Sequence, residues 1–119
     1  ANLGDALAQY RMGFKYLRGD YDDYANEDVI KRVALYWFKK SAKNGYPPSS
    51  KALAEINLGE FGFSYNKDEA IYWLLKAKEG YTKQAKKIHP SHFSFLKSEA
   101  EEELFLIMNQ LNILKFKNL

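Results

Sequence analysis

Residues 34–40 read Ala34-Leu35-Tyr36-Trp37-Phe38-Lys39-Lys40, and the pattern recurs as Ala70-Ile71-Tyr72-Trp73-Leu74-Leu75-Lys76. A second pair of segments precedes these two in the same order: Ala8-x-Tyr10-x-Met12-Gly13 recurs as Ala54-x-Ile56-x-Leu58-Gly59. Ordered self-similarity of this kind indicates a repeat protein. We therefore predict two stacked helix pairs, in which the small Ala and Gly face the neighbouring helix and the aromatic residue fills the space between pairs.

Apolar residues at helical spacing extend this interpretation over the whole chain. In the second helix, Val29, Val33, Tyr36 and Trp37 are predicted to share one face, and Trp37 and Trp73 are predicted to be core residues. The last helix carries acidic residues early and Lys115 late, the order that the helix dipole favours. The predicted helices cover residues 5–18, 27–44, 51–60, 66–79 and 82–88, followed by a long helix from about residue 93.

Turn-forming residues set the predicted helix ends. Gly19, Gly45 and Gly80 are expected to stop three helices, because glycine accepts a left-handed conformation. The segment Pro47-Pro48-Ser49-Ser50 is predicted to be a connector, since proline disfavours helix in the residue before it. Residues 66–69 form a capping box, in which the Asn66 side chain accepts a hydrogen bond from a backbone amide of the fourth helix.

These segments resemble the Sel-one-like repeat, a relative of the tetratricopeptide repeat. Residues 8–19 are similar to its first helix and residues 34–45 to its second, whereas residues 54–59 and 69–80 keep the pattern in an eroded copy. The resemblance implies an all-α fold, a short α/α solenoid of two Sel-one-like (tetratricopeptide-like) repeats with a degenerate third unit and a C-terminal capping helix. We expect one domain, residues 1–119, divided at about 6–45, 46–81 and 82–119, with a polar, charged outer face on the cap.

Composition narrows the class of protein. The 119 residues, 46% hydrophobic and 16% aromatic, suit a single small domain with its own core. The chain has no cysteine, which excludes disulfides, thiolate metal sites and a cysteine nucleophile. A net charge of +3 is too small to argue by itself for nucleic acid. No apolar run is long enough to cross a membrane, so no membrane insertion is expected.

The resemblance implies a protein-binding scaffold whose inner surface, formed mainly by the first helices, contacts the partner. We predict partner-binding residues at positions that lie off the core stripes or in the enlarged acidic loop after the first helix, where aromatic rings sit beside carboxylates able to meet a basic surface. They are Gln9, Arg11, Lys15, Tyr16, Lys51 and Glu55 on the inner surface and Tyr21, Asp22, Asp23 and Tyr24 in the loop.

Three interpretations of the acidic loop stay open. It could be merely solvated, it could contact the partner, or it could bind calcium. The calcium interpretation is the weakest, because the glycine and the bidentate glutamate of a calcium loop are missing after Asp20, Asp22 and Asp23.

Other polar residues have simpler explanations. His89 and His92 lack further ligands at metal-binding spacing and are assigned to a loop and a helix start, so no metal or other cofactor is expected. An acid–base pair such as Asp22 with His89 would arise only by coincidence, so we predict that the protein is not an enzyme. A basic group could meet RNA or an acidic protein, but it lacks interleaved aromatics and is expected to be a solvated face. It comprises Lys76, Lys78, Lys83, Lys86 and Lys87.

Two repeats leave too little length for a scaffold with many clients, so we expect one dedicated protein partner. Small bacterial proteins of the resembling family include immunity proteins that occlude a cognate secreted toxin, and the resemblance is compatible with that role. The alternatives are a general adaptor cut from a longer repeat protein and, less favoured, an RNA-binding helical repeat. A first residue other than Met fits either a trimmed chain or a mature exported protein, periplasmic or secreted in a bacterium; otherwise the protein would be cytoplasmic.

Overall fold

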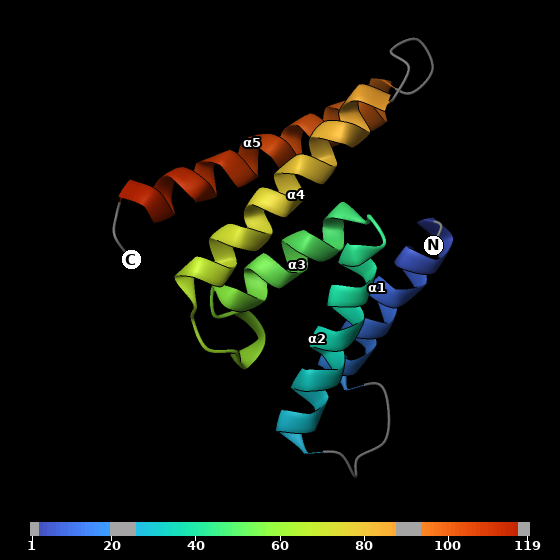
Figure 1. Ribbon diagram of the computed structural model, residues 1–119, viewed down its shortest axis with the longest axis vertical. Helices are drawn as coiled ribbons and strands as arrows, with labels where there is room; N and C mark the ends of the chain where they lie inside the picture. The colour runs from blue at the N-terminus through green and yellow to red at the C-terminus, as the bar shows by residue number, and fades with distance from the viewer. Residues whose placement is uncertain (1–2, 20–25, 88–93, 117–119) are drawn as a thin grey trace.

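The computed structural model of the chain describes residues 3–19, 26–87 and 94–116. All regular elements in these ranges are helical, with no strand. Figure 1 shows their order along the chain. The helices are α1 (Leu3–Arg18), α2 (Glu27–Lys43), α3 (Pro47–Asn57), the short 3-10 helix η1 (Glu60–Gly62), α4 (Lys67–Lys87) and α5 (Ser94–Phe116).

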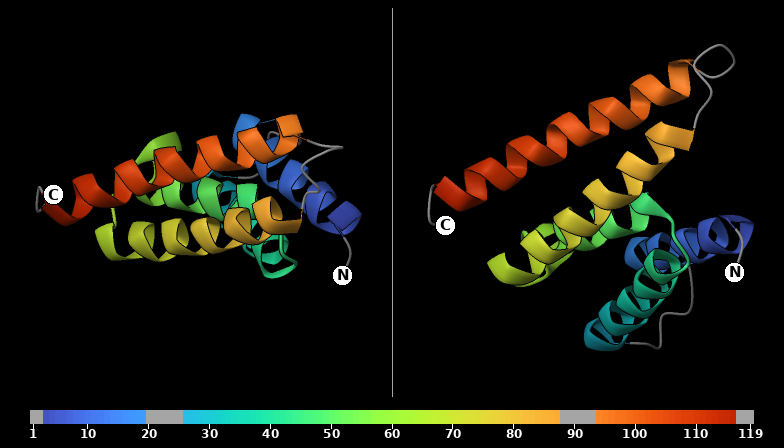
Figure 2. Two further views of the ribbon diagram at one scale, coloured as in Figure 1. Left: turned by 90° about the horizontal axis from the view of Figure 1, so that it is seen from above. Right: turned by 45° about the horizontal axis from the view of Figure 1, so that its top comes forward.

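The helices stack as two hairpins followed by one more helix. α1 packs against α2, α3 packs against α4, and α2 joins the hairpins by contacting α3. α5 lies along α4 on the side away from α1 and α2 (Figures 1 and 2). The molecule measures 50 × 38 × 20 Å, so it is a flat stack. The predicted short all-α repeat solenoid is confirmed.

Two hydrophobic clusters hold the stack together. The first combines Ala34 and Phe38 of α2 with Ala52, Leu53 and Ile56 of α3. The second joins α3 and α4 to α5, and the half-buried Trp73 packs against both clusters. The second cluster consists of Ala54, Ala70, Leu74, Ala77, Tyr81, Ile107, Leu111 and Leu114.

A buried polar junction ties the first three helices together. The Ser41 hydroxyl of α2 donates a hydrogen bond of 2.6 Å to the Ala6 carbonyl oxygen of α1. Ser41 Oγ also lies 2.5 Å from the Ser49 hydroxyl of α3, and both serines are buried. Because Ser41 has one hydroxyl hydrogen, the Ser49 hydroxyl is the donor in the second bond. Three helices thus share one satisfied hydrogen-bond chain.

Two glycines mark the closest helix contacts. A Cβ at Gly13 would lie 2.7 Å from the ring of the fully buried Phe38, so the predicted approach of α1 to α2 is confirmed. A Cβ at Gly80 would lie 2.8 Å from the Pro47 ring of α3. The predicted stop at Gly80 is therefore wrong, because this glycine serves packing inside α4. α4 continues to Lys87 and absorbs the short basic helix expected over 82–88.

Other helix ends differ from the sequence predictions for local reasons. α3 begins at Pro47 rather than Lys51, since proline suits the first helical positions, where the missing N–H is not needed. The helix then ends at Asn57, and Gly59 follows it with φ 97°, so Gly59 does not pack as Gly13 does. Gly19 and Gly45 end α1 and α2 with positive φ, as predicted.

The buried faces of the helices also differ in part. In α2 the buried residues are Ala34, Phe38 and Ser41, whereas Val29 and Tyr36 are exposed. The predicted face was off by one position, because the aromatic that fills the space between helices is Phe38 and not its neighbour Trp37, which is half-buried. Ala8 is exposed, although its counterpart Ala54 is buried.

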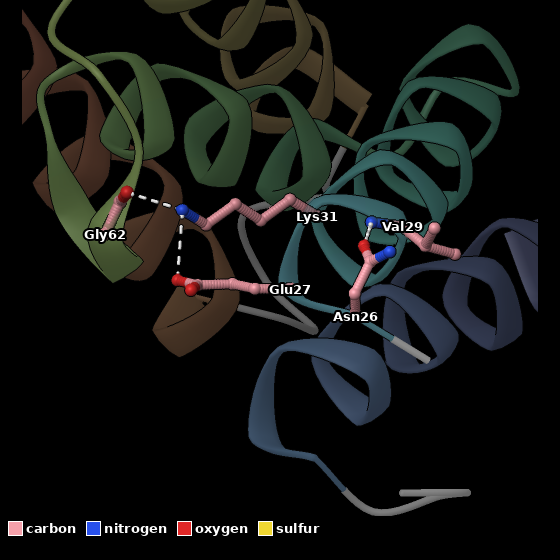
Figure 3. Close-up of polar contacts among 5 residues, drawn as sticks. All are labelled: Asn26, Glu27, Val29, Lys31 and Gly62. Carbon is pink, nitrogen blue, oxygen red and sulfur yellow. Dashed lines mark hydrogen bonds and ion pairs between the residues drawn. The ribbon is translucent and has the colours of Figure 1, made fainter. Parts of the chain in front are cut away.

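Polar contacts fix the start of α2 against the turn before α4 (Figure 3). The Asn26 side chain accepts a hydrogen bond of 2.9 Å from the Val29 amide and caps α2. The Lys31 ammonium donates a hydrogen bond of 2.8 Å to the Gly62 carbonyl oxygen and pairs with Glu27 at 3.2 Å. At the start of α4, the Asn66 cap predicted from the sequence is confirmed, since its side chain accepts from the Glu69 amide at 3.1 Å.

The outer side of α5 is less polar than predicted. Its inner side covers α4 with Ile107, Leu111 and Leu114, as a cap should. The outer side nevertheless exposes large apolar side chains among its polar ones. These are Phe105, Leu106, Met108 and Ile113.

Candidate functional site

An open cleft of about 250 Å³ lies where the first helices of both hairpins meet the end of α4 and α5. We call it the inner cleft. α3 runs along it from Pro48 to Glu55, and α1, α4 and α5 each contribute at least one wall residue. The inner cleft is lined by Tyr10 and Phe14 of α1, Pro48, Lys51, Ala52 and Glu55 of α3, Tyr81 of α4 and Glu103 of α5.

Aromatic rings form a rigid wall on the α1 side of the inner cleft. The rings of Tyr10 and Phe14 meet edge to face with centroids 5.0 Å apart. Tyr10 also contacts Tyr46 at 5.2 Å, and Phe14 rests on the fully buried Phe38 at 5.0 Å. Because these rings support one another from the core outward, the wall is preorganised.

Charged side chains of α3 and α5 also line the inner cleft. Lys51 makes a part-buried ion pair with Glu103 across the two helices. Burial raises the pKa of the Glu55 carboxyl; Lys51 opposes this shift, and Glu60 and Glu103 add to it. In the described part of the chain no hydrogen bond or ion pair engages the Glu55 carboxylate. Glu55 is thus a half-buried acid without a cation of its own.

Two phenols complete the polar lining. Burial raises the pKa of Tyr10, and the nearby Tyr46, Glu55 and Glu103 raise it further. Burial likewise raises the pKa of Tyr81 far above its ordinary value, with Glu103 next in effect. Both phenols therefore stay neutral in ordinary buffers and can donate hydrogen bonds into the inner cleft.

The structure brings together only part of the predicted binding set. Lys51 and Glu55 line the inner cleft. Arg11 and Lys15 are exposed on α1 outside it. The Gln9 side-chain oxygen accepts a hydrogen bond of 2.8 Å from the side-chain amide of Asn44, at the end of α2, so the Gln9 side chain turns toward α2. Tyr16 packs against the first hydrophobic cluster. The loop residues Tyr21, Asp22, Asp23 and Tyr24 lie outside the described residues.

Sequence reasoning missed most of the lining. Tyr10 and Phe14 have the spacing of core residues, and nothing in that spacing distinguishes a ring that covers the core from one that also lines a cleft. Tyr81 and Glu103 reach the inner cleft only because α4 runs past Gly80 and α5 folds back along it. The six lining positions outside the predicted binding set are Tyr10, Phe14, Pro48, Ala52, Tyr81 and Glu103.

The other candidate sites are less organised. Among the predicted basic group, Lys76 lies 5.7 Å from the Tyr72 ring and Lys83 pairs with Glu79 at 3.4 Å. His89 and His92 lie outside the described residues. Within the described ranges, no three His, Cys, Asp or Glu side chains are grouped to hold a metal ion. None of the described helices has the length and apolarity needed to cross a membrane.

The family comparison agrees with this architecture. The model of the Sel1 repeat matches residues 6–46 and 52–80, more than half of the chain. The chain belongs to the Sel1 repeat family. Sel1 repeats generally mediate protein–protein interactions and are typically non-catalytic. Searches of curated proteins and of solved structures found no match.

The Sel1 match also explains how the inner cleft is composed. Its α1 and α3 walls come from the first helices of the two Sel1 repeats. Glu103 belongs to α5, beyond the matched residues, so the capping helix contributes a wall as well as covering the core.

Proposed function

We propose that this Sel1 repeat protein is non-catalytic and binds one dedicated protein partner through the inner cleft and the α1 surface beside it. The observation that carries the proposal is the joint construction of one cleft by both repeats and the capping helix. Arg11 and Lys15, exposed next to the cleft on α1, would extend the contact. Gln9, Tyr16 and the loop residues Tyr21, Asp22, Asp23 and Tyr24 remain proposed contacts at its margin.

The size and chemistry of this surface suit a protein partner. Stable protein interfaces bury about 800 Å² on each partner, centred on aromatic or charged side chains in desolvated pockets. A flat molecule of 50 × 38 Å has faces large enough for such a contact. The preorganised Tyr10 and Phe14 rings would provide its centre, because rigid aromatic groups lose little entropy on binding.

A finer proposal is that the partner is a secreted bacterial toxin and that the chain acts as its immunity protein. Occlusion needs one tight contact rather than many weak ones, and two repeats offer one inner cleft. The partner's surface would be basic, since Glu55 and the acidic segment around Asp22 favour encounter with positive charge. The alternative is a general adaptor, for which the exposed apolar side chains of α5 would supply a second surface.

A matched pair of charge reversals tests the binding surface. Glu55→Lys changes the inner cleft, whereas Glu79→Lys makes the same charge change on an exposed position of α4. The partner is identified as the protein retained from an extract of the native host, then purified and titrated against each folded variant. We expect Glu55→Lys to weaken its binding at least about ten-fold and Glu79→Lys to leave it unchanged.

Co-expression tests the finer proposal. The purified partner's gene is expressed in a bacterium with the wild-type chain, with Glu55→Lys, or alone, and surviving colonies are counted. Rescue by the wild type and not by Glu55→Lys supports an immunity role. A partner that is harmless alone contradicts that role and leaves the adaptor alternative.

A further inference from the structure

We propose that the inner cleft is a receptor for one basic side chain of the partner, an arginine or a lysine, held between the Glu55 carboxylate and the aromatic wall. This inference rests on the proposed function and specifies the chemistry that the same site would recognise. The size of the cleft, its charges and its aromatic lining all favour such a side chain.

The volume of the inner cleft limits the size of the ligand. At about 250 Å³, the inner cleft falls below the range of about 300–1,000 Å³ typical of sites that enclose a drug-sized molecule or cofactor. It is also open to solvent, so a ligand seated in it can remain attached to a larger body outside. One long side chain projecting from a protein surface meets both conditions.

The charged residues of the lining determine whether a positive or a negative side chain fits the cleft. The lining carries two carboxylates, Glu55 and Glu103, and one amine, Lys51. Lys51 pairs with Glu103 and also acts on Glu55, so the three charged lining residues leave one net negative charge. The Glu55 carboxylate would repel an anionic ligand. A cation would instead compensate for the hydration that the half-buried carboxylate has partly lost. The cleft is therefore complementary to a positive group.

The aromatic wall strengthens this preference. The faces of aromatic rings attract cations, and Arg guanidinium groups in particular stack on them. Tyr10 and Phe14 hold their rings at the cleft edge by contacts with Tyr46 and Phe38. The same chain already places lysine ammonium groups over rings elsewhere, for example Lys31 at 5.3 Å from Phe63. The Glu55 carboxylate and the two rings line the same cleft, so a flat or compact cation bound there would lie near both kinds of group.

Burial of the Glu55 carboxylate also favours a cationic ligand. Its pKa is raised because the carboxyl is desolvated, even though Lys51 acts in the opposite direction. A bound cation would restore the lost stabilisation of the charged carboxylate. A cation bound beside Glu55 would therefore lower the pKa of this carboxyl towards its ordinary value.

Small probes test the inference without the protein partner. N-acetyl-arginine amide and its neutral isostere N-acetyl-citrulline amide are titrated into the ¹⁵N-labelled protein, with N-acetyl-lysine amide as a third probe. We expect saturable shifts of the Lys51, Ala52 and Glu55 amide signals with the cationic probes. Citrulline should bind at least about five-fold more weakly, because it keeps the shape and loses the charge.

Variants locate the effect. Glu55→Gln should weaken arginine binding at least about five-fold, and Glu79→Gln, on the exposed side of α4, should not change it. Equal shifts with arginine and citrulline in the wild type would overturn the inference, as would unchanged arginine binding in Glu55→Gln.

The two proposals fail separately. If the protein partner loses affinity for Glu55→Lys while the arginine probe gives no shifts, the cleft binds protein and the inference about a basic side chain is wrong. If the arginine probe binds as expected while the affinity of the partner is unchanged by Glu55→Lys, the cleft recognises a basic side chain but the partner does not bind there, and the proposed binding surface is wrong.

Discussion

At the scale of single residues, Gly13 sets the distance between α1 and α2. Its missing side chain leaves room for the Phe38 ring, which would lie 2.7 Å from a Cβ at that position. Phe38 is fully buried and in contact with Tyr10 and Phe14, so a rotation of its ring would disrupt these packing contacts and lower the stability of the fold.

We predict that Gly13→Ala lowers the free energy of unfolding by about 1–3 kcal/mol, because overpacking outweighs the helix propensity that alanine gains. Urea unfolding followed by circular dichroism measures it. Lys15→Ala, at an exposed position of the same helix, serves as the control and should change little. A Gly13→Ala protein as stable as the wild type would mean that α1 and α2 are not in close contact here.

Glu55 should make stability depend on pH. Its surroundings are Lys51 on its own helix, Glu60 beyond it, Tyr10 on α1, and Glu103 and Tyr81 near the cap. Burial raises the pKa of Glu55 in the folded protein above the ordinary value of about 4.3. The folded state then binds more protons than the unfolded chain, so stability falls as the pH rises through this window and stays lower above it.

Glu55→Gln removes this titration. We expect the variant to melt at a higher temperature than the wild type at neutral pH and at the same temperature once the pH lies below the ordinary glutamate pKa. Calorimetric melting at several pH values checks this expectation. A lower melting temperature for Glu55→Gln at neutral pH would show that the ionised carboxylate is favourably held, contrary to the account given of the inner cleft.

At the scale of elements, one lysine holds η1 to α2. Lys31 donates to the Gly62 carbonyl and pairs with Glu27 (Figure 3). Its ammonium group also lies over the Phe63 ring. The pair is largely exposed on the Glu27 side, so its contribution to global stability should be below about 1 kcal/mol.

The local effect of losing Lys31 should be larger than the global one. We predict that Lys31→Met speeds amide hydrogen exchange over residues 60–65 while leaving the rates in α3 unchanged. Arg32→Met, at the neighbouring exposed position, provides the matched control. Unchanged exchange in residues 60–65 would mean that the turn is held by its backbone alone.

What the sequence could predict also differs from element to element. The repeated Ala–Tyr–Trp segments and the Asn66 cap were sufficient for the fold class, because helical spacing and capping are local signals. The length of α4 was not predictable from them, since Gly80 resembles a helix stop until Pro47 is seen against it. Of the inner cleft, only Lys51 and Glu55 were anticipated. Tyr81 and Glu103 depend on where α5 folds back, which no repeat signature specifies.

At the scale of the whole molecule, Trp73 links the two hydrophobic clusters. It packs against residues of both, and its indole N–H is buried without a hydrogen-bond partner among the described atoms. Trp37, at the matching repeat position, is half-buried beside Tyr36 and Lys40. The tryptophan of the second repeat therefore joins the two hydrophobic clusters, whereas the tryptophan of the first repeat lies beside exposed side chains.

We predict that Trp73→Ala costs about 3 kcal/mol of stability, whereas Trp37→Ala costs about 1 kcal/mol. Trp73→Phe should be tolerated better than Trp73→Ala, because it keeps most of the ring and removes the unsatisfied N–H. Chemical denaturation of the three variants gives the comparison. Equal losses for Trp73→Ala and Trp37→Ala would show that the two clusters are not joined through Trp73.

Binding of the partner at the inner cleft can be checked by site-specific photo-crosslinking in the native host. Benzoylphenylalanine replaces Tyr10, which lines the cleft, or Tyr72, which is exposed on the outer side of α4. We predict that irradiation joins one protein to the chain substituted at Tyr10, that Glu55→Lys abolishes this adduct, and that Tyr72 gives none. An adduct formed by the chain substituted at Tyr72, and not by the chain substituted at Tyr10, would contradict binding at the inner cleft and place the partner on the outer side of α4.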